Sequence, residues 1–374
     1  MKRVTVLGAG RVGGAIVHDL ADAFAVRAAD LDGARLDRLK NVDRIQADLS
    51  NPAAVLKAAE GADIAVNALP GSMGYAALKT LIGTGKNVVD ISFFGEDPFS
   101  LDGMAKSKGV TAVVDCGVAP GMSNLILGYH DSRMDVESFE CLVGGLPFER
   151  KWPYQYKAPF SPADVLEEYT RPARLVENGR IVTKPALSDL EIVDIEGLGS
   201  LEAFNTDGLR TLLKTMRIPS MKEKTLRYPG HAELMRILSD TGFFGTDPVD
   251  LHGSSVRPVE LTSRLLFPKW RLGENEREFT VMRIIIRGKR DGRPARVLYD
   301  LFDQGDAGTK TSSMARTTGY ACTAVVRLLL EGRIEEKGVI PPERIGAIPG
   351  CFEFVMEYMK ERNVAYGVRE ESED

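Results

Sequence analysis

Residues 4–14 read Val-Thr-Val-Leu-Gly-Ala-Gly-Arg-Val-Gly-Gly and constrain the fold more than any other segment of the chain. A short apolar run leads into a G-x-G-x-x-G turn, which is followed by a stretch with helical periodicity. A second short run over residues 25–29 ends at Asp30, about twenty residues after the turn. This order of strand, turn, helix, strand and acid predicts a Rossmann domain that binds a dinucleotide.

Each position of this motif has a physical role in dinucleotide binding. Gly8 permits the tight turn, Gly10 lets the backbone approach a pyrophosphate, and Gly13 lets the helix pack close to the strand. The N–H groups at the start of the helix, around Arg11 and Val12, then face the anion.

Asp30 bears on which dinucleotide is bound. A carboxylate at the end of the second strand accepts hydrogen bonds from the adenosine ribose hydroxyls and repels a 2′-phosphate. Arg35 is close enough in sequence to hold that phosphate, although its place beside Asp32 and Asp37 better suits a solvated helix residue. We therefore expect NAD, rather than NADP, as the cofactor.

The composition excludes several classes of protein. The chain has 374 residues, enough for about two domains, and its net charge of −5 is spread along the sequence. No basic stripe indicates a nucleic-acid partner, and no apolar run is long enough to cross a membrane. The four cysteines form no C-x-x-C pair and the four histidines lack a zinc-binding spacing, so no metal is expected. Because the first strand begins almost at Met1, we expect no signal peptide and a cytoplasmic location.

Up to about residue 120, apolar strands alternate with helices. Further strands are predicted at 43–48, 63–68, 87–91 and 110–115, which indicates a parallel sheet covered on both faces. Ligands bind beyond the carboxyl ends of such strands. We therefore expect the dinucleotide to contact, besides the glycine turn and Asp30, the following residues at strand ends: Asp48, Asn67, Ala68, Leu69, Pro70 and Ser92.

From about residue 123 the pattern changes to antiparallel hairpins. One hairpin turns at Asn178-Gly179 and another is predicted over 279–301. Helical periodicity returns after residue 311, and residues 369–374 are expected to form a solvated end. The chain is therefore predicted to be an α/β protein with a Rossmann domain at 1–122, an α+β domain at 123–310 and C-terminal helices at 311–374. The exposed face of the α+β sheet suits either a dimer contact or solvent.

Four segments together resemble the saccharopine dehydrogenase-like family of Rossmann oxidoreductases. They are residues 8–13 (GAGRVG), 67–71 (NALPG), 115–124 (DCGVAPGMSN) and 225–231 (TLRYPGH). Residues 202–209 (EAFNTDGL) and the short chain are most similar to the lysine 6-dehydrogenases of this family. The resemblance implies that the α+β domain is inserted and carries the catalytic and dimer contacts, and that the C-terminal helices return to the Rossmann domain.

The resemblance also implies a reaction, the NAD-dependent oxidative deamination of L-lysine at its ε-amine. Hydride leaves the carbon that bears this amine, the imine is hydrolysed with release of ammonia, and the aldehyde cyclises to a piperideine carboxylate. An ammonium group cannot release hydride, so the site must first remove a proton from an amine whose pKa is about 10.4 in water. Saccharopine-forming members of the family often carry an acid where this chain has Ala119, which favours a smaller amino acid as substrate.

Several residues are candidates for this chemistry. Arg227 is the first candidate for the substrate's carboxylate, which a guanidinium binds bidentately, and Arg316 is the second. His231 has the side-chain type of a general acid or base. Asp90 and Asp115 follow strands, where either can act as the base or bind the substrate's ammonium group. For each of these residues a purely structural role, as a salt bridge or a cap, remains open.

The other substrate-binding candidates lie in two of the segments that carry the resemblance. Thr206 and Asp207 can contact the distal amine, although a plain turn at Thr206-Asp207-Gly208 explains them equally well. Tyr228 follows Arg227 and can face the same cleft, or be a packing residue.

Two other functions remain open. A reductive condensation of an amine with a carbonyl acid, as in the formation of saccharopine or carboxynorspermidine, would use NADPH, which Asp30 opposes. A protein that binds NAD without catalysis could have the same fold, but polar residues at every strand end argue against it. In each case the expected partner is a small molecule, with no nucleic acid or membrane, and the expected assembly is a homodimer.

Overall fold

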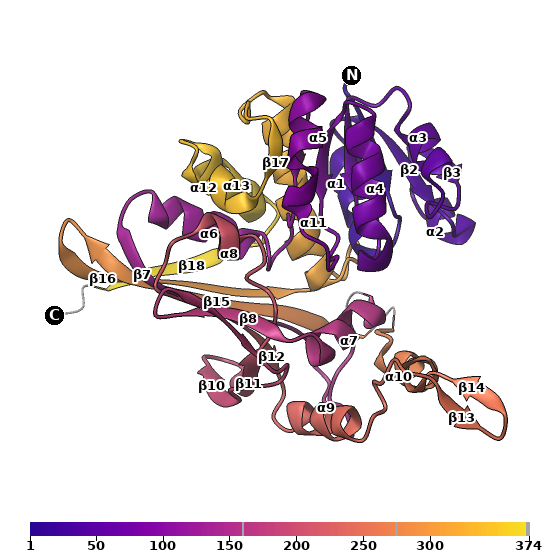
Figure 1. Ribbon diagram of the computed structural model, residues 1–374. Helices are drawn as coiled ribbons and strands as arrows, with labels where there is room; N and C mark the ends of the chain where they lie inside the picture. The colour runs from indigo at the N-terminus through magenta and orange to yellow at the C-terminus, as the bar shows by residue number, and fades with distance from the viewer. Residues whose placement is uncertain (159–160, 274–275, 372–374) are drawn as a thin grey trace. The chain divides into compact units, whose positions relative to one another are not determined.

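The chain is divided into two units, each built from segments that are distant in the sequence (Figure 1). The computed structural model describes residues 1–158, 161–273 and 276–371. Unit 1 contains Met1–Asp135 and Met314–Tyr366, and unit 2 contains Val136–Ser313 and the residues from Gly367 onward. The chain thus leaves unit 1 after Asp135 and returns at Met314, whereas the predicted divisions follow residues 122 and 310.

Unit 1 is built on a seven-stranded parallel sheet with the order β17-β6-β5-β4-β1-β2-β3. Six of these strands were predicted from the apolar runs, and the parallel Rossmann sheet is confirmed. The order reverses between β1 and β4, which is where ligands bind in sheets of this kind. The strands are β1 (Arg3–Leu7), β2 (Ala25–Asp30), β3 (Asp43–Gln46), β4 (Ile64–Asn67), β5 (Asn87–Asp90), β6 (Thr111–Val113) and β17 (Gly338–Ile340).

Helices complete unit 1. A buried apolar cluster that includes Val55, Leu78 and Val88 fills the space between the sheet and the helices α3, α4 and α5. Helix α11 packs against α1, where Gly319 lies close to Ile16. The helices are α1 (Arg11–Ala21), α2 (Gly33–Asp37), α3 (Pro52–Ala59), α4 (Gly71–Gly83), η1 (Pro98–Leu101), α5 (Asp102–Ser107), α6 (Met122–Asp131), α11 (Ser313–Leu330), α12 (Pro342–Ala347) and α13 (Cys351–Glu361).

The C-terminal helices return to the N-terminal unit, as the family resemblance implied. Asp19 on α1 accepts hydrogen bonds from Arg362 and Tyr358 at the end of α13, both at 2.6 Å. The Arg362 guanidinium also lies 3.3 Å from the centre of the Tyr358 ring. Helix α13 is thereby fixed to the same helix that follows the glycine turn.

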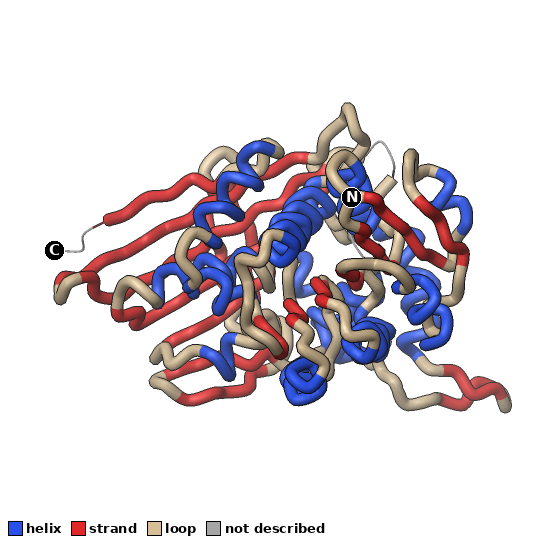
Figure 2. The backbone as a smooth tube through the Cα atoms, turned by 90° about the horizontal axis from the view of Figure 1, so that it is seen from above, coloured by secondary structure: helices blue, strands red, loops and turns tan. Residues whose placement is uncertain are grey.

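Unit 2 is built on a nine-stranded mixed sheet whose long strands are visible in Figure 2. The main order is β10-β11-β12-β7-β15-β16-β18, and β8 pairs with both β12 and β9. Both predicted hairpins are present, one between β8 and β9 and one between β15 and β16. The strands are β7 (Asp135–Pro147), β8 (Ala173–Glu177), β9 (Arg180–Lys184), β10 (Glu191–Ile195), β11 (Gly199–Asn205), β12 (Ser220–Arg227), β15 (Glu278–Arg290), β16 (Arg293–Gln304) and β18 (Tyr366–Glu371).

Unit 2 has a buried apolar cluster of its own. It includes Trp270 of α10, Phe204 of β11 and Met235 of α9. The helices of this unit are α7 (Pro162–Thr170), α8 (Leu212–Thr215), α9 (His231–Asp240) and α10 (Pro258–Trp270). A separate hairpin is formed by β13 (Val249–Leu251) and β14 (Ser254–Val256).

The end of the chain differs from the prediction. Residues 369–371, expected in a solvated end, belong to β18, which pairs with β16 at the edge of the unit 2 sheet. The strand was not predicted because its side chains are charged. An edge strand can expose charged side chains to solvent and still pair through its backbone. Residues 372–374 lie outside the described residues.

Membrane-spanning helices and clusters of metal ligands are both absent from the described residues. No helix there is long and apolar enough to cross a membrane. Across the same residues, no three His, Cys, Asp or Glu side chains are grouped so that they could hold a metal ion.

Candidate functional site

The glycine turn has the geometry that a bound pyrophosphate needs. Gly8 has a φ of 95°, and a Cβ there would lie 2.5 Å from the Ala68 oxygen. A Cβ at Gly13 would lie 2.0 Å from the Gly8 oxygen. At Gly10 a Cβ would meet nothing within 4 Å, so this glycine borders open space. Gly8 and Gly13 are thus required for packing, while Gly10 leaves room for a ligand.

The N-termini of two helices open beside this turn. Gly10 caps α1 and Pro70 caps α4, and neither supplies a side-chain hydrogen bond to the first turn of its helix. Ala68 donates to the Leu7 oxygen at 2.9 Å, which places the loop of residues 67–70 next to the turn. Backbone N–H groups at helix N-termini bind phosphate groups, so these residues fit a dinucleotide. The structure therefore brings together the predicted residues Gly8, Gly10, Arg11, Val12, Gly13, Asn67, Ala68, Leu69 and Pro70.

Asp30 ends β2, as predicted, and its carboxylate is hydrogen-bonded within the protein, while its expected contact with a ribose stays a prediction. Its Oδ2 accepts from the backbone N–H of Ala9 at 2.7 Å, and its Oδ1 accepts from that of Asp32 at 2.8 Å. Only 7% of the residue is exposed. Arg35, half exposed, has its guanidinium 3.8 Å from the same carboxylate. Asp30 thus holds the glycine turn in shape, and the half-exposed guanidinium of Arg35 lies beside its carboxylate.

Asp48, the predicted adenine contact, is exposed beyond the end of β3. Its carboxylate accepts hydrogen bonds from the Ser50 hydroxyl and N–H at 2.7 and 3.0 Å, and these bonds lower its pKa. The adenine contact itself stays a prediction.

Asp90 and Asp115 both follow strands of the sheet, as predicted, and both are buried. Asp90 accepts from the backbone N–H of Ser92 at 2.8 Å and from the side-chain amide of Asn67. Asn67 also donates to the Gly74 oxygen at 2.9 Å, so this pair joins the ends of β4 and β5 to the first turn of α4. With no exposed surface, Asp90 fits a support for the cofactor loops and not a base that meets the substrate.

Asp115 has a left-handed backbone, with a φ of 53°, and is 3% exposed. The adjacent Cys116 is buried, and burial together with the charges of Asp90 and Asp115 raises the pKa of its thiol. Cys116 is therefore a neutral thiol at physiological pH and not a nucleophile.

In unit 2, Arg227 is the centre of a buried polar cluster. Its Nη2 donates to Glu168 Oε2 at 2.6 Å, and its Nε donates to the Tyr169 hydroxyl at 3.2 Å. The guanidinium also lies 4.5 Å from the centre of the Tyr156 ring. Arg227 is 2% exposed, so it is an ion-paired residue of the core in this structure rather than an open carboxylate site.

His231 lies in the same cluster and does not fit the predicted role of general acid or base. Its Nε2 is 2.9 Å from the Tyr169 hydroxyl and its Nδ1 is 2.8 Å from the Tyr154 oxygen, so both ring nitrogens are occupied. Burial, with a smaller effect of the Arg227 charge, lowers its pKa to about 3. The geometry therefore supports the structural alternative, a neutral histidine at the start of α9.

The predicted substrate contacts are also engaged elsewhere. The hydroxyl of Tyr228 donates to the Pro147 oxygen at 2.9 Å. Asp207 forms a bidentate pair with Arg174, at 2.8 and 2.7 Å. Thr206 accepts a hydrogen bond from Thr225 at 3.1 Å.

Arg316 lies on α11 in unit 1. It donates to the backbone oxygens of Arg362 and Asn363 at 3.0 and 3.3 Å, and so satisfies carbonyls at the end of α13. These contacts fit the structural alternative that the sequence left open.

Sequence reasoning missed Glu168, Tyr169 and Tyr156. None of them lies in a segment that carries the family resemblance. The sequence pattern of α7 could have pointed to them. Its apolar residues Val165, Leu166 and Tyr169 form a buried stripe, and Glu168 lies beside that stripe. An acid next to a buried stripe indicates an ion pair only when its partner is known.

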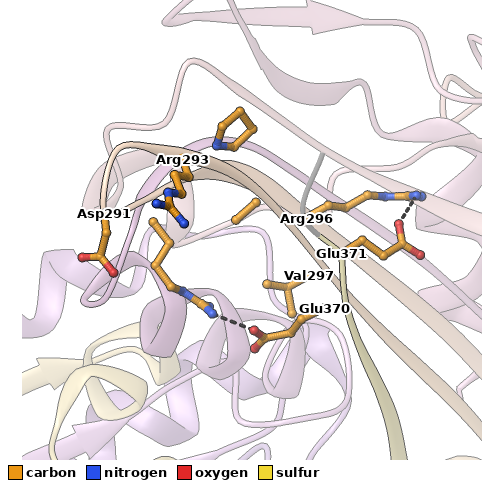
Figure 3. A pocket seen from close by; sticks show the side chains of 9 residues that line it. Asp291, Arg293, Arg296, Val297, Glu370 and Glu371 are labelled. Carbon is orange, nitrogen blue, oxygen red and sulfur yellow. Dashed lines mark hydrogen bonds and ion pairs between the residues drawn. The ribbon is translucent and has the colours of Figure 1, made fainter. Parts of the chain in front are cut away.

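A hollow of about 480 Å³ lies in unit 2 at the turn between β15 and β16 (Figure 3). Arg290 pairs there with Glu370, and Arg296 pairs with Glu371, at 2.6 and 2.8 Å. The hollow contains no predicted site residue and is lined by Arg290, Asp291, Arg293, Pro294, Ala295, Arg296, Val297, Glu370 and Glu371.

The curated relatives of this chain include alpha-aminoadipic semialdehyde synthases and saccharopine dehydrogenases. Alpha-aminoadipic semialdehyde synthase of Arabidopsis thaliana is 26% identical over 228 residues, which cover 57% of this chain and 21% of that protein. The NADP(+)-dependent, L-glutamate-forming saccharopine dehydrogenase of Schizosaccharomyces pombe is 27% identical over 233 residues, which cover 59% of this chain and 52% of that protein. The chain thus spans about half the length of these relatives or less.

A solved structure shares the fold over the whole chain. Apo saccharopine dehydrogenase (L-Glu forming) from Saccharomyces cerevisiae superposes with a TM-score of 0.79 and 21% identity, and the match covers 100% of both chains. This agreement confirms the predicted fold class.

Two family models cover nearly the entire sequence. The saccharopine dehydrogenase NADP binding domain matches residues 4–113, and the saccharopine dehydrogenase C-terminal domain matches residues 117–364. The chain belongs to the saccharopine dehydrogenase family of NAD(P)-binding oxidoreductases.

Proposed function

We propose that this protein is a nicotinamide-dinucleotide-dependent dehydrogenase that oxidises a carbon–nitrogen bond of an amino acid, with the ε-amine of L-lysine as its substrate. The observation that carries the proposal is the open space at Gly10 beside the uncapped start of α1, in a chain that matches both domains of the family.

The reaction needs three events, which the chain's residues must organise. The substrate's ammonium group loses a proton, hydride leaves the neighbouring carbon, and water hydrolyses the imine to an aldehyde and ammonium. The bound dinucleotide supplies the hydride acceptor. The residues of unit 1 at the starts of α1 and α4 would hold its phosphates, and Asp90 with Asn67 keeps the second of these loops in place.

Lysine is favoured over saccharopine by Ala119, because saccharopine-forming members often carry an acid at this position. The segment 202–209 no longer supports lysine, since Glu202 accepts from the N–H groups of Gly230 and Ala232 and Asp207 pairs with Arg174. Saccharopine is the second candidate, and the names of the curated relatives favour it.

For the cofactor we propose NADP in place of the NAD expected from the sequence. Both oxygens of Asp30 are occupied by backbone N–H groups, which weakens the repulsion of a 2′-phosphate, and Arg35 lies 3.8 Å away with half of its surface exposed. The family description of residues 4–113 as an NADP binding domain supports this choice.

Reduced-nicotinamide absorbance, followed with purified protein at alkaline pH, tests the substrate. L-Lysine, L-ornithine and saccharopine are offered separately with NAD or NADP, and turnover of lysine alone is expected. Turnover of saccharopine alone would replace lysine with the second candidate. Cofactor binding without turnover of any amine, and without consumption of reduced cofactor when an amine and a keto acid are supplied together, would show a protein that binds the dinucleotide without catalysis.

Arg35→Ala tests the cofactor. Loss of a charge-assisted contact to the 2′-phosphate is expected to raise KM for NADP by about 10- to 100-fold. KM for NAD in the same variant is the matched control and should stay within about twofold. Equal changes in both constants would show that Arg35 does not distinguish the two cofactors.

A further inference from the structure

The hairpin of β13 and β14 in unit 2 is exposed along its whole length. Its base is fixed, because Val259 at the start of α10 donates to the Gly245 oxygen at 3.0 Å. Beyond this base every residue of the two strands is exposed except Val256, which is partly buried. Figures 1 and 2 both show the hairpin extending beyond α10 with no other described helix or strand beside it. A two-stranded hairpin is marginally stable in water by itself, so this one calls for a partner surface.

The hairpin has one apolar face. Val249 and Leu251 are two positions apart in β13, so their side chains point to the same side. Val256 pairs with Val249 across the hairpin and extends this face. Val249 and Leu251 are 46% and 49% exposed. Large apolar side chains that are grouped on one exposed face mark an interaction site, whereas single scattered ones do not.

Helix α10 carries a second exposed apolar stripe. Leu261 and Leu265 are four positions apart, which places them on one face of the helix. They are 49% and 63% exposed. A different side of α10, with Leu266 and Trp270, packs in the buried cluster of unit 2. The stripe is therefore not part of the chain's own core, and each copy exposes two apolar surfaces of similar size.

The charges of the two surfaces are opposite. The hairpin contains Asp250 and is preceded by Asp247, and neither strand contains Lys or Arg. Helix α10 exposes Arg264 and Lys269. The remaining charges of this helix, one acid and the arginine that caps it, form an ion pair at 3.7 Å. Complementary charges orient two surfaces and disfavour other partners. The hairpin thus matches α10 both in apolar surface and in charge.

We propose that two copies of this chain associate by exchanging these hairpins. Each hairpin lays the face of Val249 and Leu251 on the Leu261–Leu265 stripe of the other copy. A contact between two unlike surfaces occurs twice about a twofold axis, so a closed dimer leaves neither surface exposed. This surface is distinct from the face of the unit 2 sheet, for which the sequence left a dimer contact open. The association is independent of the proposed function, because it involves neither substrate nor cofactor.

Leu265→Asp tests the exchange, with Leu56→Asp as the matched control. Leu56 lies on α3 of unit 1 and is a helical leucine with 49% of its surface exposed. Sedimentation equilibrium of the full-length chain should show a dimer at micromolar concentration for the wild type and for Leu56→Asp. Leu265→Asp should raise the dissociation constant of the dimer by about 100-fold, because the change occurs at both contacts. Hydrogen exchange of the hairpin amides should also become about 10-fold faster in this variant, although the substitution lies on the helix.

Reversed charges test which surfaces meet. One chain carries Asp247→Lys and Asp250→Asn on the hairpin, where asparagine keeps the acceptor for the Gly253 N–H. The second chain carries Arg264→Glu and Lys269→Glu on the helix. Each chain alone places like charges together at both contacts and should dimerise about 10-fold more weakly than the wild type. In an equimolar mixture both contacts join opposite charges, so the affinity should return to within about threefold of the wild type.

The other ways to cover the hairpin give different results. A monomeric wild type with protected hairpin amides would show that the chain covers its own hairpin, and one with unprotected amides would leave the hairpin to another protein. Either result would overturn the exchange. Dissociation of the dimer by Ile192→Asp, on the exposed strand β10, but not by Leu265→Asp would overturn it in favour of a contact through the sheet. A mixture of the two charge variants that is no tighter than each variant alone would also overturn it.

Discussion

His231 donates to the Tyr154 oxygen, accepts from Tyr169 and is 1% exposed, so the folded protein keeps its ring neutral. An imidazole in water has a pKa of about 6.5, and here burial lowers the pKa to about 3. From the residue type, His231 could be either a proton-transfer group or a structural residue. Its position behind Tyr169 makes it a fixed hydrogen-bond acceptor instead.

This buried histidine makes stability depend on pH. Because its pKa is lowered on folding, its contribution to stability is fully present above about pH 6.5 and is lost as the pH falls toward 3. The total lost is roughly 3–5 kcal/mol. We expect the unfolding temperature, measured by calorimetry between pH 8 and pH 4, to fall less steeply in His231→Asn than in the wild type. Parallel curves for the two proteins would contradict a neutral, buried His231.

At the scale of elements, the apolar runs predicted the sheet of unit 1 because each strand is buried on both faces. The glycine turn could also be predicted from the sequence, because the positive φ at Gly8 and the close backbone contact at Gly13 both require glycine. The contacts of Asp30, Arg227 and Asp207 could not be predicted in the same way. Each of them depends on a group that only the folded chain brings near, such as Ala9, Glu168 or Arg174.

The close packing of α6 against α12 is another contact that could not be predicted from the sequence. Gly128 on α6 lies so close to α12 that a Cβ there would be 1.9 Å from the Glu343 oxygen. Gly346 on α12 faces α6 in return, where a Cβ would be 2.0 Å from the Leu125 oxygen. The two helices therefore touch through their backbones, and glycine is needed on both sides.

Gly128→Ala is accordingly expected to destabilise unit 1. The methyl group must push the helices apart, at a cost of about 1–3 kcal/mol, as for an overpacked core. Gly103→Ala is the matched control, because Gly103 lies in α5 with nothing within 4 Å of its Cβ position. That change should stabilise the helix by about 0.5–1 kcal/mol. Chemical denaturation of both variants measures the difference, and equal stabilities would refute the backbone contact.

At the scale of the whole molecule, each unit is completed by the last part of the chain. The segment Met314–Tyr366 completes unit 1, and β18 then adds an edge strand to the sheet of unit 2. Side chains reinforce this strand, since Arg369 pairs with Asp300 at 2.7 Å and the pairs of Glu370 and Glu371 are visible in Figure 3. Neither unit corresponds to one continuous stretch of sequence. A division of the chain into consecutive domains therefore assigns the residues from Gly367 onward to the wrong unit.

Removal of residues 367–374 should therefore weaken unit 2 and not unit 1, although the helices that precede this segment belong to unit 1. The backbone groups of β16 that pair with β18 would be exposed as a new sheet edge, which also favours aggregation. By hydrogen exchange, amides of Arg293–Gln304 should exchange about 10-fold faster or more, equivalent to about 1.4 kcal/mol, while those of Arg3–Leu7 keep their protection. The full-length double variant Glu370→Gln, Glu371→Gln loses only partly exposed ion pairs and should change exchange by less than about threefold. Equal acceleration in β1 and β16 would instead show that the end of the chain stabilises both units together.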